Sequence, residues 1–402
     1  MLISSKKKKH NSTQLFYICQ YLNYTNSKNM KFIVSTQLLL KSLQQISGVI
    51  GSNNVLPILE DFLFDINNNT IKIIASDIET SMSTQITVQS EESGKIAIPA
   101  KLLLETLKTL PEQPLMFTIS EDDSYGIEIT SSNGKYKLTG ENAEDFPKIP
   151  QSAETTQIVM PAKVLLRALH HTIFAVSNDE MRPAMTGVYV QLDQNGTTFV
   201  ATDAQKLVRY KRKDITNNTS ANFIVPKKAI GLLKSALPDD DTLVTISYNN
   251  SNAYFKFNEV NLICRLIDAK YPDYNAVIPL DNPNFLTINR VEFQNSLKRT
   301  SIFSNKTTYQ VVLSMAGSEL KISAKDIDFS NEAQETLICN YNGSDLTIGF
   351  NSKYIIEMLG VLGSEEINGE FSTPSRAGVL IPNDMETNED ILMLIMPIML
   401  NV

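Results

Sequence analysis

A sixteen-residue stretch occurs three times in this chain, and it constrains the fold more than any other feature. It reads IAIPAKLLLETLKTLP from Ile96, FIVPKKAIGLLKSALP from Phe223 and, with more differences, IGFNSKYIIEMLGVLG from Ile348. The copies lie 127 and 125 residues apart, which is the length of an ordinary domain. The 402 residues are therefore predicted to form an array of three similar domains.

Each copy is predicted to be a short strand followed by a helix. The helix begins at Pro99, Pro226 or Asn351, and proline suits a first helical turn because its missing N–H would have no partner there. Apolar residues stand four and eleven positions after that start. At about 100° per residue, the second position lies roughly opposite them. That second position is always lysine: Lys101, Lys228 and Lys353. Each helix is thus predicted to have a core face and a cationic face.

Charge is unevenly distributed along the chain. Six helices are predicted, at 35–50, 99–110, 161–177, 226–237, 290–304 and 351–362, and they hold 12 Lys/Arg but only 3 Asp/Glu. Because the net charge of the chain is −8, the remainder carries −17. In any single helix, the lysines are explained equally well by helix propensity. Their recurrence at one repeat position favours a functional surface that attracts anions.

The segments between the helices alternate apolar and polar residues, and turn signals such as Asn67-Asn68-Asn69 separate them, so they are predicted to be strands. Each domain then consists of two β-α-β-β-β halves. The predicted fold class is α+β, with three repeated domains of antiparallel sheets and few helices.

The domains are placed at 30–150, 151–279 and 280–402. Residues 1–29 differ from the rest and are expected to be a disordered N-terminal extension. Its lysine run, Lys6 to Lys9, is interpreted as part of a solvated tail rather than a nucleic-acid arm, and no cleavage site for a signal peptide follows it. Met30 opens the regular pattern and is a second candidate for the translation start.

Catalytic motifs are absent from the sequence: there is no GxGxxG, GxxxxGK[ST], GxSxG or HExxH. Asp77, Asp203 and Asp326 share one repeat position at the end of a strand, where a role in turns is expected. His170 and His171 are adjacent, so on a helix they point about 100° apart and cannot face one metal ion. The prediction is a protein without enzymatic activity, metal or cofactor. Two alternatives stay open, a hydrolase that uses Asp77 or Asp203 and a β-repeat interaction scaffold that does not bind DNA.

The three cysteines, Cys19, Cys264 and Cys339, are scattered and odd in number, so neither a disulfide framework nor a zinc site is predicted. A reducing, cytoplasmic location fits this pattern. The longest apolar run, 391–400, is short and contains Pro397, so no membrane helix is predicted.

From Met30 to Val402 the chain resembles the bacterial β sliding clamps, the processivity subunits of DNA polymerase III. The matching motifs are KFIV, LPIL, VATD at 200–203, VPKK at 225–228, YPDY at 271–274, GFNSKY at 349–354 and the terminal MPIML. The resemblance implies a head-to-tail homodimer of three-domain subunits, closed into a ring with helices lining the hole and sheets outside. It also implies three kinds of partner that bind through short linear motifs: the polymerase catalytic subunit, the clamp loader and repair proteins.

The resemblance implies sequence-independent contacts to double-stranded DNA. They map to Lys101, Lys163, Arg167, Arg182, Lys227, Lys228, Lys298, Arg299 and Lys353. The family commonly has an arginine in the loop before LPIL, where this chain has Asn53.

A hydrophobic pocket for partner peptides is also implied. Its residues map to Arg182, Met185, Gly187, Thr202, Leu207, Pro272, Val277, Tyr354, Leu394, Met396, Pro397, Ile398 and Leu400. From the residues alone, the terminal LIMPIML fits a buried last strand. Pro397 opposes that reading because proline cannot donate to a central ladder, and methionine suits an adaptable surface. Met399 stands where the family often has arginine.

The seam between subunits is expected between the first domain of one subunit and the third domain of the next. One side holds Lys135, Tyr136 and Lys137, and the other holds Ile302, Phe303, Glu332 and Glu335. Opposite charges and apolar contacts suit a closing interface of this kind. A solvated strand edge explains each of these residues equally well.

Overall fold

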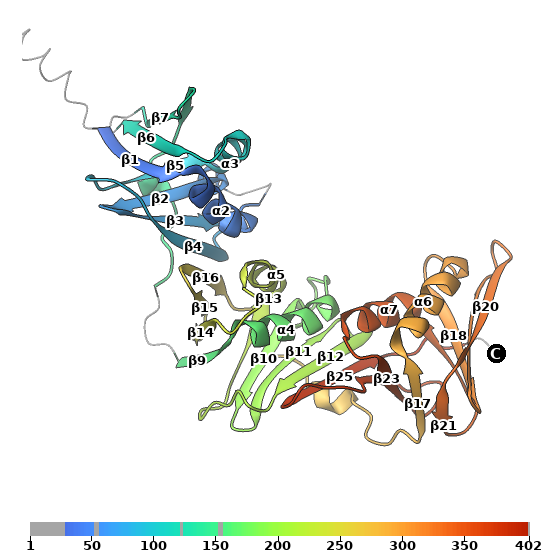
Figure 1. Cartoon of the computed structure of the whole chain (residues 1–402). Coiled ribbons are helices and arrows are strands. Elements are labelled where there is room, and N and C mark those ends of the chain that lie inside the picture. The colour runs from blue at the N-terminus through green and yellow to red at the C-terminus, as the bar shows by residue number, and fades with distance from the viewer. Residues whose placement is uncertain (1–28, 52–55, 121–123, 152–155, 401–402) are drawn as a thin grey trace, which may run out of the picture. The chain divides into compact units, whose positions relative to one another are not determined.

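The computed structural model describes residues 29–51, 56–120, 124–151 and 156–400 (Figure 1). Residues 1–28 of the predicted extension and Asn53 lie outside this described part. The chain forms two compact units, one of residues 1–151 with 258–263 and one of residues 152–257 with 264–402.

The first unit contains two β-α-β-β-β halves, as the repeat predicts. The first half is β1 (Asn29–Ser35), α2 (Thr36–Ile46), β2 (Asp61–Asn67), β3 (Thr70–Ser76) and β4 (Thr80–Thr87). The second half is β5 (Gly94–Pro99), α3 (Ala100–Thr109), β6 (Pro114–Ser120), β7 (Gly126–Thr130) and β8 (Lys135–Thr139). The strands form two antiparallel layers, one in the order β1–β6–β7–β8 and one in the order β5–β2–β3–β4.

The same order of elements continues through the rest of the chain. The third and fourth halves are β9 (Thr156–Pro161), α4 (Ala162–Thr172), β10 (Gly187–Asp193), β11 (Gly196–Thr202), β12 (Lys206–Arg212), β13 (Ala221–Pro226), α5 (Lys227–Ala236), β14 (Leu243–Tyr248), β15 (Asn252–Phe257) and β16 (Val260–Arg265). The fifth is β17 (Asn284–Asn289), α6 (Arg290–Thr300), β18 (Gln310–Ala316), β19 (Glu319–Asp326) and β20 (Asn331–Ile338), followed by the short β21 (Asn340–Asn342). The sixth is β22 (Leu346–Asn351), α7 (Ser352–Val361), β23 (Glu366–Phe371), β24 (Gly378–Pro382) and β25 (Glu389–Ile395).

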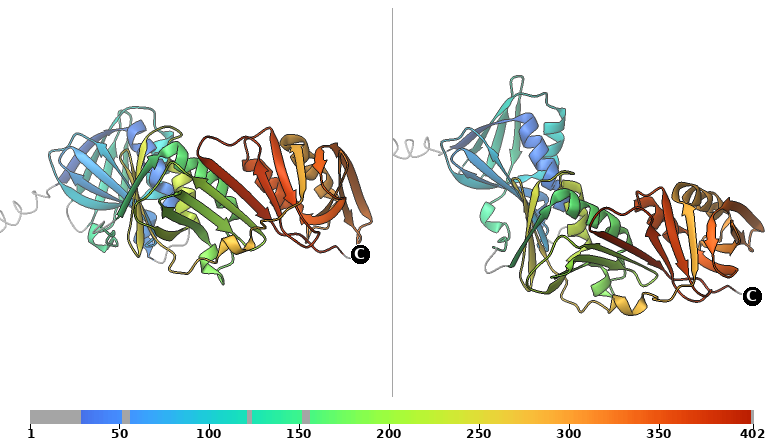
Figure 2. Two further views of the ribbon diagram at one scale, coloured as in Figure 1. Left: turned by 90° about the horizontal axis from the view of Figure 1, so that it is seen from below. Right: turned by 60° about the horizontal axis from the view of Figure 1, so that its bottom comes forward.

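A nine-stranded antiparallel sheet runs through the second unit in the order β13–β10–β11–β12–β25–β24–β23–β17–β21. The last strand of the chain therefore joins the third half to the sixth. β12 and β25 pair over seven residues, from Lys206 opposite Ile395 to Arg212 opposite Glu389, and Figure 2 shows the green and red strands side by side. Helices α4, α5, α7 and α6 form a row on one side of the strands in Figure 1.

Aromatic and aliphatic side chains fill the cores. In the first unit Phe32 stacks on Phe117 with ring centroids 4.6 Å apart, and Leu39 of α2 and Leu103 of α3 are fully buried. Burying an aliphatic side chain of this size contributes roughly 1.5 to 3 kcal/mol. Packing of these faces, rather than helix propensity, holds such short helices.

The helices are shorter than predicted at their ends. α2, α4 and α6 each pass into a 3₁₀ turn of three residues, at Ser47–Val49, Ile173–Ala175 and Ser301–Phe303. Such turns commonly close the last turn of a helix. Pro99 and Pro226 are N-cap residues and not the first helical residues.

The apolar position eleven residues after each start does not lie on the helix, so that part of the prediction is wrong. Leu110, Leu237 and Leu362 are C-cap residues with extended backbone. The fourth position behaves as predicted, because Leu103, Ile230 and Ile355 are all buried. Among the described residues, no helix is long and apolar enough to cross a membrane.

Candidate functional site

The three repeat lysines lie on the side of their helices that faces away from the core. Lys101, Lys228 and Lys353 are all exposed, whereas the buried residues of α3, α5 and α7 are apolar or small. The predicted separation of a core face and a cationic face is therefore confirmed. Of the six described helices, α4, α5, α7 and α6 lie in one row in the second unit (Figure 1).

Several of the predicted DNA-contacting cations form ion pairs within the chain. Lys163 lies 2.8 Å from Asp241, and Arg182 donates to Asp179 at 2.8 Å. Arg299 makes two hydrogen bonds to Glu335, at 2.7 and 2.6 Å, although the two residues were predicted for different interfaces. These pairs are partly exposed, so water and salt screen them.

Arg167 has a different environment from the other cations of the helix face. Its Nε and Nη2 donate to the two carboxylate oxygens of Glu389 at 2.6 and 2.9 Å. The side chain of Glu389 is completely buried, and although burial acts to raise its pKa, the hydrogen bonds from Arg167 and the positive charge of its guanidinium lower it. Glu386 approaches Arg167 at 3.5 Å and Arg212 at 3.6 Å. This bidentate geometry makes Arg167 a link between α4 and β25.

His171 packs beneath this ion pair. Its ring stacks on Tyr210 with centroids 5.5 Å apart, and its Nδ1 donates to the carbonyl of Arg167 at 2.7 Å. Burial lowers the pKa of His171 to about 4, so the ring is neutral at physiological pH. Burial lowers the pKa of the neighbouring His170 as well, and the positive charges of Lys234 and Arg167 add to this effect.

The remaining predicted DNA contacts are more available to an external anion. Lys227 donates to Asn178 at 2.8 Å, and the ammonium of Lys353 lies 3.3 Å from the ring centre of Tyr309. In the described part of the chain, the ammonium groups of Lys101 and Lys298 have no hydrogen-bond or ion-pair partner.

Three of the predicted peptide-pocket residues lie at the same end of three adjacent strands of the nine-stranded sheet. Thr202, Leu207 and Leu394 are direct neighbours in register across β11, β12 and β25. Leu207 and Leu394 belong to an apolar cluster, and sequence analysis missed most of its other members: Val200, Ile224, Tyr271 and Ala377. Tyr189 stacks on Tyr271 at 4.5 Å within it. The YPDY motif at 271–274 was the available signal for Tyr271.

The end of the chain lies at the edge of this cluster. β25 stops at Ile395, and beyond it the Met396 N–H donates to Gln205 and the Ile398 N–H to Gly349, both at 2.8 Å. Leu394 is 2% exposed and Met396 is 38% exposed. The segment LIMPIML therefore contains the end of a buried strand, up to Ile395, and a more accessible part that begins at Met396.

Lys206 joins the pocket residues to α7 and was also missed. It is buried, its ammonium lies 2.8 Å from Asp203 and 3.4 Å from Glu357, and it stands 4.2 Å from the ring centre of Tyr354. The other predicted pocket residues lie around the cluster. Gly187 is buried; Met185, Pro397, Ile398 and Leu400 are half-buried; Arg182, Pro272 and Val277 are exposed.

Five of the seven predicted seam residues lie on two edge strands. Lys135, Tyr136 and Lys137 are exposed on β8, and both lysines contact Glu128 of the neighbouring strand. β20 is an edge strand as well and carries Glu332 and Glu335. Ile302 and Phe303, in the 3₁₀ turn after α6, are 64% and 42% exposed.

The three repeated aspartates serve turns, as predicted. Asp77 accepts a hydrogen bond from the Thr80 N–H at 2.6 Å, Asp203 from the Lys206 N–H at 2.9 Å, and Asp326 from the Asp328 N–H at 3.2 Å. Within the described residues, no three His, Cys, Asp or Glu side chains are placed to hold a metal ion.

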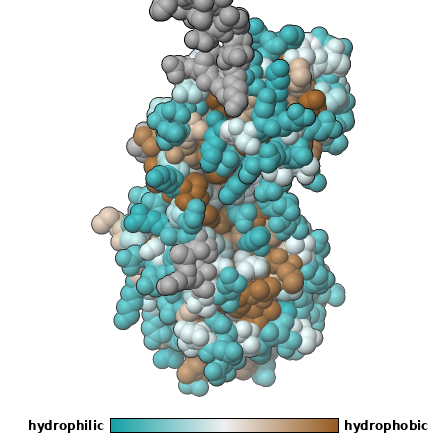
Figure 3. Space-filling view, turned by 90° about the vertical axis from the view of Figure 1, so that its left-hand side faces the viewer, coloured by the Kyte–Doolittle hydropathy of each residue, from teal (hydrophilic) through white to brown (hydrophobic). Residues whose placement is uncertain are grey.

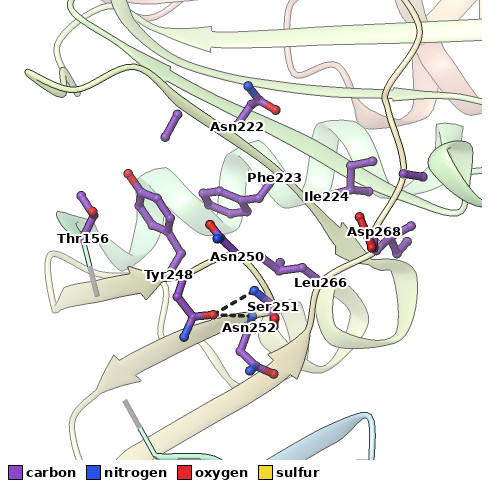
Figure 4. Close-up of a pocket in the computed structure, with 14 residues that line it drawn as sticks. Thr156, Asn222, Phe223, Ile224, Tyr248, Asn250, Ser251, Asn252, Leu266 and Asp268 are labelled. Atoms are coloured by element: carbon purple, nitrogen blue, oxygen red, sulfur yellow. Dashed lines mark hydrogen bonds between the residues drawn. The ribbon is translucent and has the colours of Figure 1, made fainter. Parts of the chain in front are cut away.

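A cavity of about 770 Å³ in the second unit has a polar wall (Figure 4). Its asparagines fold a turn, since Asn249 accepts from the N–H groups of Ser251 and Asn252 at 2.9 and 2.8 Å. None of the predicted site residues lines it. Figure 3 shows a face on which hydrophilic side chains prevail and hydrophobic ones form separate patches.

Three successive segments of the chain match known protein families. Family profiles of the DNA polymerase III beta subunit match three times, the N-terminal domain at residues 30–150, the central domain at 159–273 and the C-terminal domain at 275–399. The beta sliding clamp of Bacillus subtilis is 29% identical over 381 residues, which cover 92% of this chain and 99% of that protein. The beta sliding clamp of Streptococcus pneumoniae is 28% identical with the same coverage.

Solved structures agree with the family profiles. The DNA polymerase sliding clamp of Bacillus subtilis superposes with a TM-score of 0.88 at 28% identity, covering 93% of this chain and all of that chain. The sliding clamp of Pseudomonas aeruginosa bound to griselimycin gives 0.87 at 26% identity, with coverages of 92% and 100%. The chain therefore belongs to the DNA polymerase III beta subunit family, the bacterial sliding clamps.

Proposed function

We propose that this sliding clamp acts as a head-to-tail homodimer that closes around duplex DNA, with its six helices toward the DNA. Each subunit supplies three clamp domains, at 30–150, 151–279 and 280–402. The clamp is a non-catalytic processivity factor of the polymerase, and the alternative of a scaffold without DNA binding is not favoured. As a DNA replication protein, it is expected to act in the cytoplasm.

The exposed lysine at the same position of α3, α5 and α7 carries the proposal for DNA contact. Cations that contact phosphates without reading bases give weak, salt-dependent attraction in every register, which permits sliding. The acidic remainder of the chain limits adhesion of other surfaces to DNA. All nine mapped cations, including Arg167, Arg182 and Lys227, are retained in this proposal as the DNA-facing set.

Substitution of Lys228 and Lys353 by glutamine tests the proposal. Loss of two phosphate contacts in each subunit, four in the homodimer, should weaken DNA association and reduce the slope of log K against log salt by about 3.6. The matched control is Lys256→Gln, since Lys256 is exposed on β15 outside the helices. Unchanged binding and processivity in the double variant would contradict the DNA-facing assignment.

The apolar cluster around Leu207 and Leu394 supports a second part of the proposal, a pocket for short linear motifs of the polymerase, the clamp loader and repair proteins. Buried leucine and tyrosine side chains form its floor, and the exposed Met396 and half-buried Pro397 of the terminal segment border it. Apolar pockets with a few polar groups at the rim suit peptide anchors of this kind.

Exposed edge strands support the dimer. β8 carries two lysines and β20 carries two glutamates, and both strands leave one row of backbone groups without a strand neighbour in the described part of the chain. An edge of this kind pairs readily with another chain unless it is covered. We assign the pairing of these two edges to the subunit seam.

A further inference from the structure

The first unit has a groove of about 1070 Å³ on one face of its sheet. Leu63 and Asp65 of β2 line it, while Phe62 and Phe64, which alternate with them, point into the core. Phe146 and Ile149 of the segment that leaves the domain close one side of the groove.

The groove occupies the place in its domain that the apolar pocket occupies in the next. In register, Leu63 lies between Ile74 and Ala97. Tyr189 lies in the same way between Val200 and Ile224. Phe146 packs on the first row as Tyr271 packs on the second, and a proline follows each of them. The repeat has therefore placed a second apolar site on the first domain.

Two differences separate this groove from the pocket. The pocket's exit segment contains an extra 3₁₀ turn, Tyr274–Val277, whereas only Lys148 separates Pro147 from Ile149 in the first domain. One wall of the groove is consequently shorter. In addition, Asp61 stands at the strand start where the pocket has Gly187, and its buried Oδ2 has no hydrogen-bond partner.

The rim of the groove is acidic. Glu144 lines the groove, Glu141 and Asp145 are sequence neighbours of its lining residues, and none of the three forms an ion pair among the described residues. The nearby Lys95 is neutralised by Asp65 at 2.9 Å, which leaves Lys148 as the unpaired cation of the lining. An occupant of complementary chemistry has apolar side chains next to several positive charges.

The chain itself contains a segment of that chemistry. Residues 6–18 read KKKKHNSTQLFYI, a run of four lysines followed by four apolar residues, and neither the ring nor the pocket uses it. Asn29, where β1 starts, is the fourteenth residue after Leu15, and a stretch of that length spans up to about 46 Å. A domain of this size is roughly 35 Å across, so the segment can reach any point on it.

We infer that residues 6–18 dock in the groove of their own first domain, with Leu15–Ile18 on the apolar floor and Lys6–Lys9 against the acidic rim. Attachment to the same chain gives the segment an effective concentration of about 1 mM, so modest affinity is sufficient for occupancy.

Disulfide trapping in the full chain tests this inference, because Cys19 follows the apolar residues directly. Ala143→Cys places a thiol in the groove lining, and Glu105→Cys places the matched control on the exposed face of α3. Under mild oxidation, the A143C chain should form an intramolecular disulfide with Cys19 at least about tenfold faster than the E105C chain, since only a docked segment holds the thiols together.

Charge reversal provides the second measurement. Lys6–Lys9→Glu should slow trapping in the A143C chain to the rate of the E105C control, and adding Glu144→Lys with Asp145→Lys should restore it. A synthetic peptide of residues 5–21 in excess should compete. Equal trapping rates at positions 143 and 105, a failure of the charge swap, or disulfides formed only between two chains would each overturn the inference.

Discussion

Cations of the helix face differ in what they do, although they look equivalent in the sequence. Lys101 and Lys298 are free among the described residues, whereas Arg167 is held by a fully buried carboxylate. The buried Glu389 would be uncompensated without Arg167, so the pair is primarily structural. The same residue can still present its outer edge to DNA because a third of its side chain is exposed.

Arg167→Ala should therefore destabilise the folded chain by about 3 kcal/mol, the cost of leaving a buried charge unpaired. Lys163→Ala, which breaks an exposed pair on the same helix, should cost less than about 1 kcal/mol. Urea unfolding followed by circular dichroism measures both. Equal losses in the two variants would show that burial of Glu389 does not matter to stability.

The raised pKa of Asp61 makes the free energy of unfolding depend on pH. Burial, with the nearby charges of Glu141 and Glu60, raises the pKa of Asp61 from 3.8 to about 7. Between those values the folded chain keeps a proton that the unfolded chain has lost, so the contribution of Asp61 to stability decreases as pH rises from 4 to 7.

Asp61→Asn should remove this contribution to the pH dependence and raise the melting temperature at pH 8. Asp145→Asn is the control, because Asp145 is exposed on the same unit. Thermal melts at pH 5 and pH 8 provide the comparison. A melting temperature at pH 8 that is no higher than that of the unchanged chain would contradict the assignment.

At the scale of helices and strands, the sequence predicted the order of elements because each pattern occurs in three domains, so a weak pattern in one copy could be identified from the other two. All six helices and the β-α-β-β-β order were accessible in this way. The ends of the helices were not, since Leu110, Leu237 and Leu362 keep helical spacing while the backbone has already become extended. Local spacing does not report where a 3₁₀ turn or C-cap ends a helix.

Residues of the candidate site could be predicted only at positions that the family resemblance assigns. Arg167 and Glu389 are separated by 222 residues, and nothing in their local sequences connects them. Lys206 is a similar case. A lysine at the start of a strand is usually exposed, but the side chain of Lys206 is buried against Tyr354. Such pairings depend on how the strands come together, which single-sequence periodicity does not contain.

The terminal segment is the element whose removal should separate the proposed functions. Deleting Met396–Val402 removes the exposed border of the pocket but leaves β25 intact, so binding of a fluorescent polymerase-derived peptide should fall at least about tenfold, a loss of roughly 1.4 kcal/mol or more. Dimerisation should be unchanged, as measured by sedimentation. Met385→Ala, at an exposed methionine in the turn before β25, is the control. Retained peptide affinity after the deletion would remove the pocket assignment.

At the scale of the whole molecule, the seam predicts a charge-swap experiment. Lys137→Glu should weaken the dimer, since Lys137 on β8 and Glu332 on β20 carry opposite charges at the proposed seam, and the added Glu332→Lys should restore it. Both side chains are exposed, so neither change disturbs a core. Sedimentation velocity over a range of protein concentrations reports the dissociation constant. A single variant that dimerises like the unchanged chain, or a double variant without recovery, would place the seam elsewhere.

The pairing of β12 with β25 also affects how the protein is made. On the ribosome, β12 is complete at Arg212, but its neighbour begins only at Glu389, 177 residues later. At about 5 to 20 residues per second, the open edge of the growing sheet waits roughly 10 to 35 s for the strand that covers it. Nascent chains of this clamp should therefore depend on chaperones late in synthesis, and messages truncated before the codon for Glu389 should yield aggregates rather than shortened clamps.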